Sequence, residues 1–298
     1  MRVFILLIFI LAVSISCNPE SKTKSRVVVK SPKKYELHKA PDSKQVLIVF
    51  PGGGNTIKMT KEEFKIIPKA IENDISVLVM NFNRCLWING IQAKELAMQI
   101  KEIFRSNELS TADVYMGGMS IGGNVALSLT SFQIKSNSTV QSKGVFIVDS
   151  PIDLYSLYQS CLADISNPEL GKERLEEPRW IVNYFEEYFD KDSILENILK
   201  ESPYTLKVQK NNFEELKETK LRFYTEPDSL WWQENRMTQY ENTNAYSIEQ
   251  VAQQLRKEGW EKLELIQTKN KGYRSNGDRH PHSWSIVDLD EIIMWMNK

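Results

Sequence analysis

The sequence predicts an α/β fold built on a doubly wound, mostly parallel sheet. Three observations lead to this prediction: short apolar runs rich in β-branched residues, amphipathic helical patterns between them, and a regular alternation of the two from residue 45 onward. Runs that are apolar almost throughout suit strands covered on both faces. Because strand and helix take turns, the strands are expected to be parallel and joined by crossover helices.

Each element is predicted from its own pattern. The predicted strands, in chain order, are 45–50, 75–80, 113–118, 144–149, 221–226 and 263–268. The predicted helices, which carry apolar residues at helical spacing, are 60–73, 90–106, 121–134, 246–258 and 283–297. The alternation stops between Asp149 and Leu221, where the chain is rich in aromatic and acidic side chains with helical spacing. An insertion between late strands is expected to lie over the strand ends as a helical cap, at about residues 152–216.

The length and charge of the chain limit the classes of function that the protein can have. The chain has 298 residues, enough for one large α/β domain with a sizeable core. Its 38 basic and 39 acidic side chains are interspersed and leave a formal net charge of −1, so the sequence carries no electrostatic footprint for nucleic acid. A small neutral or weakly polar partner is therefore expected.

The N-terminal segment is distinct from the rest of the chain. Arg2 precedes an apolar run from Val3 to Val13, which is too short to cross a bilayer as a stable helix and is followed by small residues before Cys17. The segment resembles a lipoprotein signal peptide, in which Cys17 becomes the lipidated first residue of the mature chain. A cleaved ordinary signal and an uncleaved anchor are the alternatives.

The resulting domain prediction is a signal peptide at 1–17, a polar tether at 18–34 and one domain at 35–298. It implies an exported protein that is lipid-anchored to the bacterial cell envelope, on its periplasmic or surface face. Cys85 and Cys161 are then left over; free thiols are the preferred interpretation, and a disulfide is the alternative. The sequence has no C-x-x-C pair and no His/Cys cluster with metal-ligand spacing, so no metal and no cofactor is predicted.

The pattern G-x-S-x-G occurs at residues 118–122, with Ser120 at its centre. A predicted strand runs directly into Ser120, and a predicted helix begins directly after it. In this setting the serine lies at the tip of a tight turn, where glycines two residues away on either side let the backbone approach itself closely. The hydroxyl is expected to project above the carboxyl ends of the strands, where open parallel sheets bind ligands. Ser120 is therefore the candidate nucleophile.

The strand, turn and helix around Ser120 resemble the nucleophile elbow of the α/β-hydrolase fold superfamily, which includes serine esterases, lipases and peptidases. The resemblance covers about residues 35–298. It implies a catalytic triad in the chain order nucleophile, acid, histidine, with the acid after a late strand and the histidine after the last strand.

A serine hydroxyl needs a base to take its proton. His38 lies before the core strands and is expected at the surface, whereas His280 and His282 lie between the last predicted strand and the final helix. The resemblance places the base in this later loop. His282 is favoured because Pro281 stiffens the approach and Ser283 can cap the following helix, and His280 is the alternative.

The base needs an acceptor that fixes its tautomer. By the resemblance this acid follows a late strand, where Asp228 is the first candidate and Glu226 the second. Asp149, after the preceding strand, is the third, although Asp before Ser-Pro is also common in turns.

Backbone donors for a developing oxyanion are sought near the same strand ends. The N–H of Ile121 is one, and the resemblance implies Gly53 in FPGGGNT as the other. This glycine run lacks the Lys-Ser/Thr of a phosphate-binding loop, so nucleotide binding is not expected. The candidates for substrate binding are Trp231, Trp232 and Arg84, the aromatic pair for stacking and the arginine for gripping a carboxylate.

The sequence thus predicts a serine hydrolase that cleaves a carboxylic ester through an acyl-enzyme. The expected partners are a small-molecule, glycan or peptide ester and, through the N-terminal lipid, a membrane. A peptidase or amidase, an acyltransferase and an inactive envelope binding protein on the same fold are the alternatives.

Overall fold

The computed structural model describes residues 26–28, 34–82 and 84–298. The predicted parallel strands are all present, each within two residues of its expected bounds. They are β3 (Gln45–Phe50), β4 (Ile75–Met80), β5 (Val114–Met119), β6 (Ser142–Val148), β9 (Lys220–Thr225) and β10 (Leu263–Gln267). Every pair of neighbours among them is parallel.

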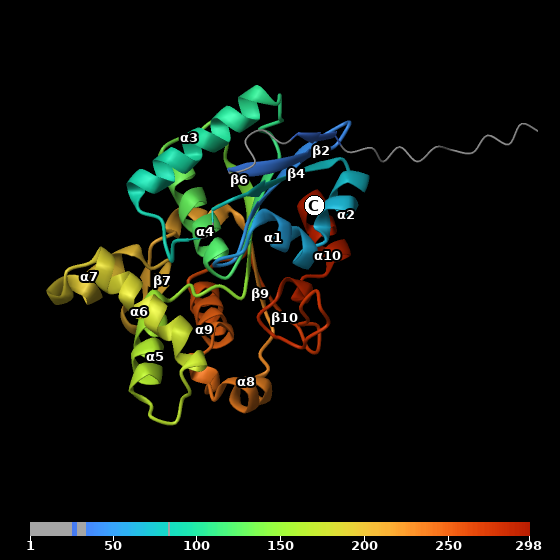
Figure 1. Cartoon of the computed structure of the whole chain (residues 1–298). Coiled ribbons are helices and arrows are strands. Elements are labelled where there is room, and N and C mark those ends of the chain that lie inside the picture. Colours follow the sequence, from blue (N-terminus) through green and yellow to red (C-terminus); the bar gives the residue numbers. More distant parts are fainter. Residues whose placement is uncertain (1–25, 29–33, 83) are drawn as a thin grey trace, which may run out of the picture.

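Two strands that the sequence analysis missed extend the sheet at one edge. They are β1 (Arg26–Val28) and β2 (Tyr35–Lys39), which pair antiparallel with each other and, through β2, with β4. Within the described residues the sheet has eight strands in the order β1-β2-β4-β3-β5-β6-β9-β10. A mostly parallel sheet covered by helices confirms the predicted fold class (Figure 1).

His38 was expected at the surface, and this expectation is wrong. It lies in β2 and is only 7% exposed, with its Nε2 atom 2.7 Å from Oε1 of Glu36. The strand escaped prediction because polar residues such as Glu36 and Lys39 alternate with its apolar ones, so it forms no run that is apolar throughout.

The segments 1–17 and 18–34 can be compared with the structure only in part. Cys17 lies outside the described residues, as does the whole of the predicted signal peptide. Within the predicted tether, Arg26–Val28 belongs to the sheet as β1.

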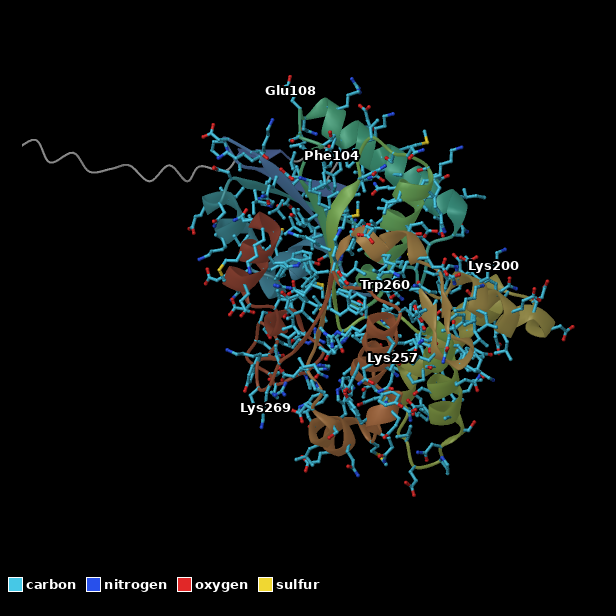
Figure 2. All side chains as sticks on the ribbon, turned by 180° about the vertical axis from the view of Figure 1, so that it is seen from behind. Phe104, Glu108, Lys200, Lys257, Trp260 and Lys269 are labelled. Carbon is cyan, nitrogen blue, oxygen red and sulfur yellow. The ribbon has the colours of Figure 1, made fainter. Side chains whose placement is uncertain are left out.

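Helices cover both faces of the sheet. One face carries α3 (Gly90–Ser106), α4 (Ile121–Lys135) and α9 (Asn244–Lys257), and the other carries α1 (Ile57–Glu63), α2 (Ile66–Glu72) and α10 (Leu289–Asn297). Alternate residues of β3 point to the two faces, as a pleated strand requires. Phe104 on α3 and Trp260 after α9 lie among the interior side chains of the first face (Figure 2).

Two predicted helices are each divided. The predicted helix 60–73 is α1 followed by α2, with the break at Phe64 and Lys65. The predicted helix 283–297 begins instead with a 3-10 turn at Trp284–Ile286, and α10 then begins after Asp288, whose side chain accepts from the N–H groups of Asp290 and Glu291.

The predicted cap interval folds as helices and short turns. It contains α5 (Leu154–Ser166), α6 (Glu176–Tyr188) and α7 (Ile194–Glu201), then the hairpin of β7 (Tyr204–Thr205) and β8 (Lys210–Asn211). The remaining helix, α8 (Ser229–Arg236), follows β9. In Figure 1 the cap helices form a yellow-green group at one end of the molecule, and Figure 2 shows Lys200 on this group from behind.

Aromatic stacking fastens the cap to the loop after β4. The indole of Trp87 lies against Phe185 and Phe189, with ring centroids 5.3 and 4.9 Å away.

The cysteines Cys85 and Cys161 are both buried and free. Burial raises the pKa of each thiol to about 12, so both are protonated at neutral pH.

Candidate active site

Ser120 sits on a strained turn between β5 and α4. Its φ and ψ are 54° and −130°, a backbone conformation that side-chain-bearing residues rarely adopt. Such strain costs on the order of 1–3 kcal/mol and persists only where the surroundings enforce it. Here β6 helps to enforce it, because the N–H of Ser120 donates to the carbonyl of Val148 at 2.9 Å.

The glycines of the motif are required by close backbone contacts. A Cβ atom at Gly118 would lie 2.1 Å from the carbonyl carbon of Gly122, and one at Gly122 would lie 2.4 Å from the carbonyl oxygen of Pro51. Neither position can hold a side chain without moving backbone. The pattern G-x-S-x-G therefore reflects how tightly the helix start packs against the ends of two strands.

His282 is paired with Asp149. The Nδ1 atom of His282 lies 2.6 Å from Oδ2 of Asp149, whose side chain is almost fully buried. Asp149 follows β6 directly and is itself fixed: its N–H donates to the carbonyl of Tyr224, and its carbonyl accepts from the side-chain amide of Asn244, both at 2.9 Å. With Nδ1 directed to the carboxylate, Nε2 of the neutral ring is the nitrogen available to accept a proton.

The expectation that Asp228 orients the histidine is wrong. Asp228 instead caps α8 by accepting from the N–H of Trp231 at 3.0 Å, and it pairs with Arg279 at 2.5 Å. The sheet order explains the correction: β6 is the neighbour of β5, which ends at the serine, whereas β9 is one strand further away. The third sequence candidate, Asp149, therefore occupies the position that was expected for the first.

Glu226 is a structural residue of the loop that carries the histidines. Its Oε2 atom accepts from the N–H groups of Lys271 and Gly272 and from the hydroxyl of Thr268, all within 3.0 Å. Its other oxygen pairs with Arg279 at 2.5 Å.

Arg279 holds the loop that carries His280 and His282 against the loop after β9. Sequence reasoning missed this role. The guanidinium of Arg279 pairs with Glu226 and Asp228 and also donates to the carbonyl of Gly272 at 2.8 Å. The two carboxylates after β9 thus fix the approach to His280 and His282 instead of taking part at the imidazole. No sequence signal distinguishes such a cation from an ordinary surface arginine.

His280 packs beside the His282–Asp149 pair and does not take the place of His282. Its ring centroid lies 4.7 Å from that of Trp231 and 5.8 Å from that of Trp232. Its Nδ1 atom accepts from the backbone N–H of His282 at 3.2 Å. Burial, reinforced by the nearby positive charge of Arg274, lowers the pKa of His280 to about 3, so the ring stays neutral at neutral pH.

The glycine-rich loop after β3 lies against the serine turn. A Cβ atom at Gly52 would be 3.8 Å from Cβ of Ser120, and one at Gly53 would be 3.5 Å from the side chain of Ile121. Ile121 is the first residue of α4, so its N–H has no acceptor within the helix. Both predicted oxyanion donors, Gly53 and Ile121, therefore lie beside Ser120.

A cavity of about 360 Å³ joins these groups. It is lined by Ser120, Gly53, Ile121, His280 and His282 together with cap residues from α5 and α6. Trp232 lines it too, while Trp231 is not among its lining residues and packs against His280. Arg84, a predicted substrate contact, is exposed and does not line this cavity.

Two kinds of feature are absent from the described residues. Across 26–28, 34–82 and 84–298, no three His, Cys, Asp or Glu side chains are grouped so that they could hold a metal ion. In the same part of the chain, no helix combines the length and the apolar character needed to cross a membrane.

Comparison with known proteins identifies the fold. No protein-family model matches the chain, and no curated protein matches its sequence. Among solved structures, the Pyrobaculum calidifontis esterase is similar with a TM-score of 0.58 and 14% identity, over 93% of this chain and 86% of that one.

Two other esterases are similar to the same extent. Carboxyl esterase 2 of the mycorrhizal fungus Tuber melanosporum has a TM-score of 0.57 and 16% identity, over 95% of this chain and 87% of that one. An esterase of the bacterial hormone-sensitive lipase family has a TM-score of 0.55 and 12% identity, over 93% and 84%. The chain thus has the α/β-hydrolase fold of these esterases.

Proposed function

We propose that this protein is a serine hydrolase that cleaves a carboxylic ester through an acyl-enzyme. The observation that carries the proposal is the combination in one cavity of a serine on a strained turn and a histidine whose Nδ1 is held by a buried carboxylate. A binding protein without catalytic activity would require neither the strained backbone of Ser120 nor the His282–Asp149 pair. The solved structures to which this chain is similar are those of esterases, and this favours an ester over an amide as the bond that is cleaved.

The proposed reaction has two halves. Nε2 of His282 takes the proton from Ser120 as its oxygen attacks the ester carbonyl, and Asp149 holds the ring and stabilises its protonated form. The N–H groups of Ile121 and Gly53 stabilise the oxyanion of the tetrahedral intermediate. His282 then gives the proton to the departing alcohol. A water molecule, deprotonated by His282, hydrolyses the acyl-enzyme and frees Ser120.

The test uses a fluorophosphonate probe and short p-nitrophenyl esters. We expect wild type to be labelled and to cleave the esters, and we expect both activities to be lost in Ser120→Ala. His282→Ala should lose turnover as well. Labelling that persists in Ser120→Ala would show that another residue is the nucleophile. Turnover of peptide p-nitroanilides in place of esters would favour the peptidase alternative, and transfer of the acyl group to an added alcohol would favour the acyltransferase.

We also propose that Cys17 carries a lipid and that the enzyme acts at the cell envelope. The support is the charged start, the apolar run and the small residues before Cys17. Metabolic labelling with an alkyne fatty acid tests this: wild type should incorporate the label and fractionate with membranes, and Cys17→Ser should do neither. Equal labelling of both proteins would contradict the proposal.

A further inference from the structure

The cavity beside Ser120 has a basic wall that the proposed reaction does not use. Three arginines line it: Arg174 from the cap, Arg236 at the end of α8, and Arg274 in the loop that leads to His280 and His282. Their surroundings differ, and this difference indicates which of them can meet a substrate.

Arg174 is occupied within the protein. Its guanidinium pairs with Asp164 at 3.1 Å and donates to the hydroxyl of Thr238 at 2.9 Å and to the carbonyl of Arg236 at 3.0 Å. These contacts tie the cap to the segment after α8. Asp164 and Arg174 neutralise each other, so this pair adds no net charge to the cavity.

The side chain of Arg274 is not held by partners as that of Arg174 is. The backbone of Arg274 is fixed by a hydrogen bond from its N–H to the carbonyl of Asp278 at 2.8 Å. Its guanidinium, by contrast, is partly buried and makes no hydrogen bond and no ion pair with any residue that the structure describes. The guanidinium of Arg236, which is exposed, makes none either within those residues. Both cations therefore face the cavity without a partner.

Among the described residues that line the cavity, three arginines face two carboxylates, Asp164 and Glu177, which leaves a formal surplus of one positive charge. Burial lowers the pKa of Arg274 from its ordinary value and Arg236 acts in the same direction, while Glu63, Asp149 and Glu177 act against them. Arginine nevertheless keeps its charge at neutral pH. Of these carboxylates, Asp149 is paired with His282 and Glu63 accepts from Ser275.

Among the described residues of the cavity lining, Glu177 is then the carboxylate that remains. It is exposed and makes no ion pair with either arginine. A partly buried cation without a counter-ion is unfavourable, and an entering anion removes that cost.

We propose that Arg274, assisted by Arg236, binds a free carboxylate group of the substrate. This inference rests on the proposed esterase function and narrows its substrate class to esters that carry a second, ionised carboxyl group on the acyl or the alcohol part. A guanidinium matches the two oxygens of a carboxylate in a bidentate pair. A cavity of about 360 Å³ suits a short ester of this kind.

The experiment compares esters that differ only in this charge. Monoethyl glutarate is paired with its neutral monoamide, ethyl 4-carbamoylbutanoate, for the acyl side, and 4-acetoxybenzoate with 4-acetoxybenzamide for the alcohol side. We expect wild type to prefer the charged member of at least one pair by about 10-fold or more in kcat/KM. Arg274→Met should remove this preference by lowering kcat/KM for the charged member about 10-fold more than for the neutral member, because charge-assisted hydrogen bonds are lost only for the charged ester. Arg236→Met should have a smaller effect in the same direction.

A matched control removes one positive charge elsewhere. Arg256→Met, on the exposed side of α9, should leave all four rates unchanged. Equal rates for both members of each pair in wild type would overturn the inference and leave the esterase intact. An equal loss for charged and neutral esters in Arg274→Met would also overturn it, because the residue would then act on the general shape of the site.

Binding gives an answer that does not depend on turnover. Monoethyl glutarate is titrated calorimetrically into Ser120→Ala and into the double variant Ser120→Ala, Arg274→Met. Binding that weakens about 10-fold or more in the double variant supports the anion site even where no ester is cleaved, which would separate it from a failed esterase proposal. Absent binding to Ser120→Ala, or equal affinities, would overturn the anion site.

Discussion

The loops after β6 and β9 both begin with acidic residues, yet they use them differently. Asp149, after β6, is held through its own N–H and carbonyl by hydrogen bonds to Tyr224 and Asn244, and it presents its carboxylate to His282. Glu226 and Asp228, after β9, present theirs to Arg279 and to backbone N–H groups. The type of residue and its place after a strand are the same in both loops. What differs is the neighbour: β6 lies next to the strand that ends at Ser120, and β9 does not.

The largest effect that tests this comparison is expected at Asp149. Asp149→Asn keeps the shape of the side chain but disfavours the tautomer that leaves Nε2 of His282 free, so we expect kcat to fall by about 10⁴-fold with the fold retained. Stopped-flow or steady-state turnover measures the rate, and circular dichroism checks the fold. A loss below tenfold would mean that the carboxylate is not the partner of the base.

The next effect is expected at Glu226, in stability. Glu226→Gln removes the buried charge that faces Arg279, and we expect the free energy of unfolding to fall by about 2 kcal/mol, because another carboxylate remains beside the guanidinium. Urea unfolding measures this, and turnover per folded molecule should stay close to wild type. A loss of turnover comparable to that of Asp149→Asn would place Glu226 in the catalytic machinery.

A smaller effect is expected at Asp228. Asp228→Ala removes the cap of α8 and costs about 1 kcal/mol of stability, while kcat/KM stays within about tenfold of wild type. Asp228→Asn is the matched control, since Asn caps helices as well as Asp does. A rate that falls equally in both variants would revive Asp228 as the acid.

The stability of the folded protein at acidic pH should depend on His280. Its pKa in the folded protein is lowered from 6.5 to about 3. Between these values the unfolded chain binds a proton that the folded one excludes, so stability is complete above pH 6.5 and falls as the pH drops toward 3. We expect His280→Gln to unfold at lower pH than wild type in an acid titration followed by far-UV circular dichroism. An unchanged midpoint would show that the ring is not held neutral.

The smallest effect is expected at Arg84. It is exposed and outside the cavity lining, so Arg84→Ala should change stability by no more than about 0.5 kcal/mol. Its kcat/KM should match that of wild type for charged and neutral esters alike. A selective loss for charged esters would move the anion contact from Arg274 to the rim of the site.

The local patterns of the chain were enough to predict the six parallel strands and the serine turn. Buried parallel strands such as β3 and β4 are apolar throughout, and the elbow glycines are fixed by backbone contacts within a few residues of Ser120. The strand β2 was missed because polar residues alternate with its apolar ones and leave no run that is apolar throughout. The pairing of His282 with Asp149 depends on which strand ends are adjacent, which is a property of sheet order and not of any local pattern.

The basic wall of the cavity was beyond sequence reasoning for a related reason. The chain is almost neutral overall, and its charges are interspersed. Whether an arginine is neutralised depends on its spatial neighbours. Arg174 pairs with Asp164, ten residues earlier, while Arg274 forms no ion pair with any carboxylate in the part of the chain that the structure describes. A balanced composition therefore concealed a local surplus of positive charge.

If Cys17 carries a lipid as proposed, the position of the short strand β1 limits how far the protein can stand from the membrane. Under the proposed lipidation, the acylated residue is Cys17, and the sheet already begins at Arg26. Nine residues reach at most about 30 Å even when fully stretched, which is the thickness of one bilayer core. The outer edge of the sheet would therefore stay close to the lipid headgroups.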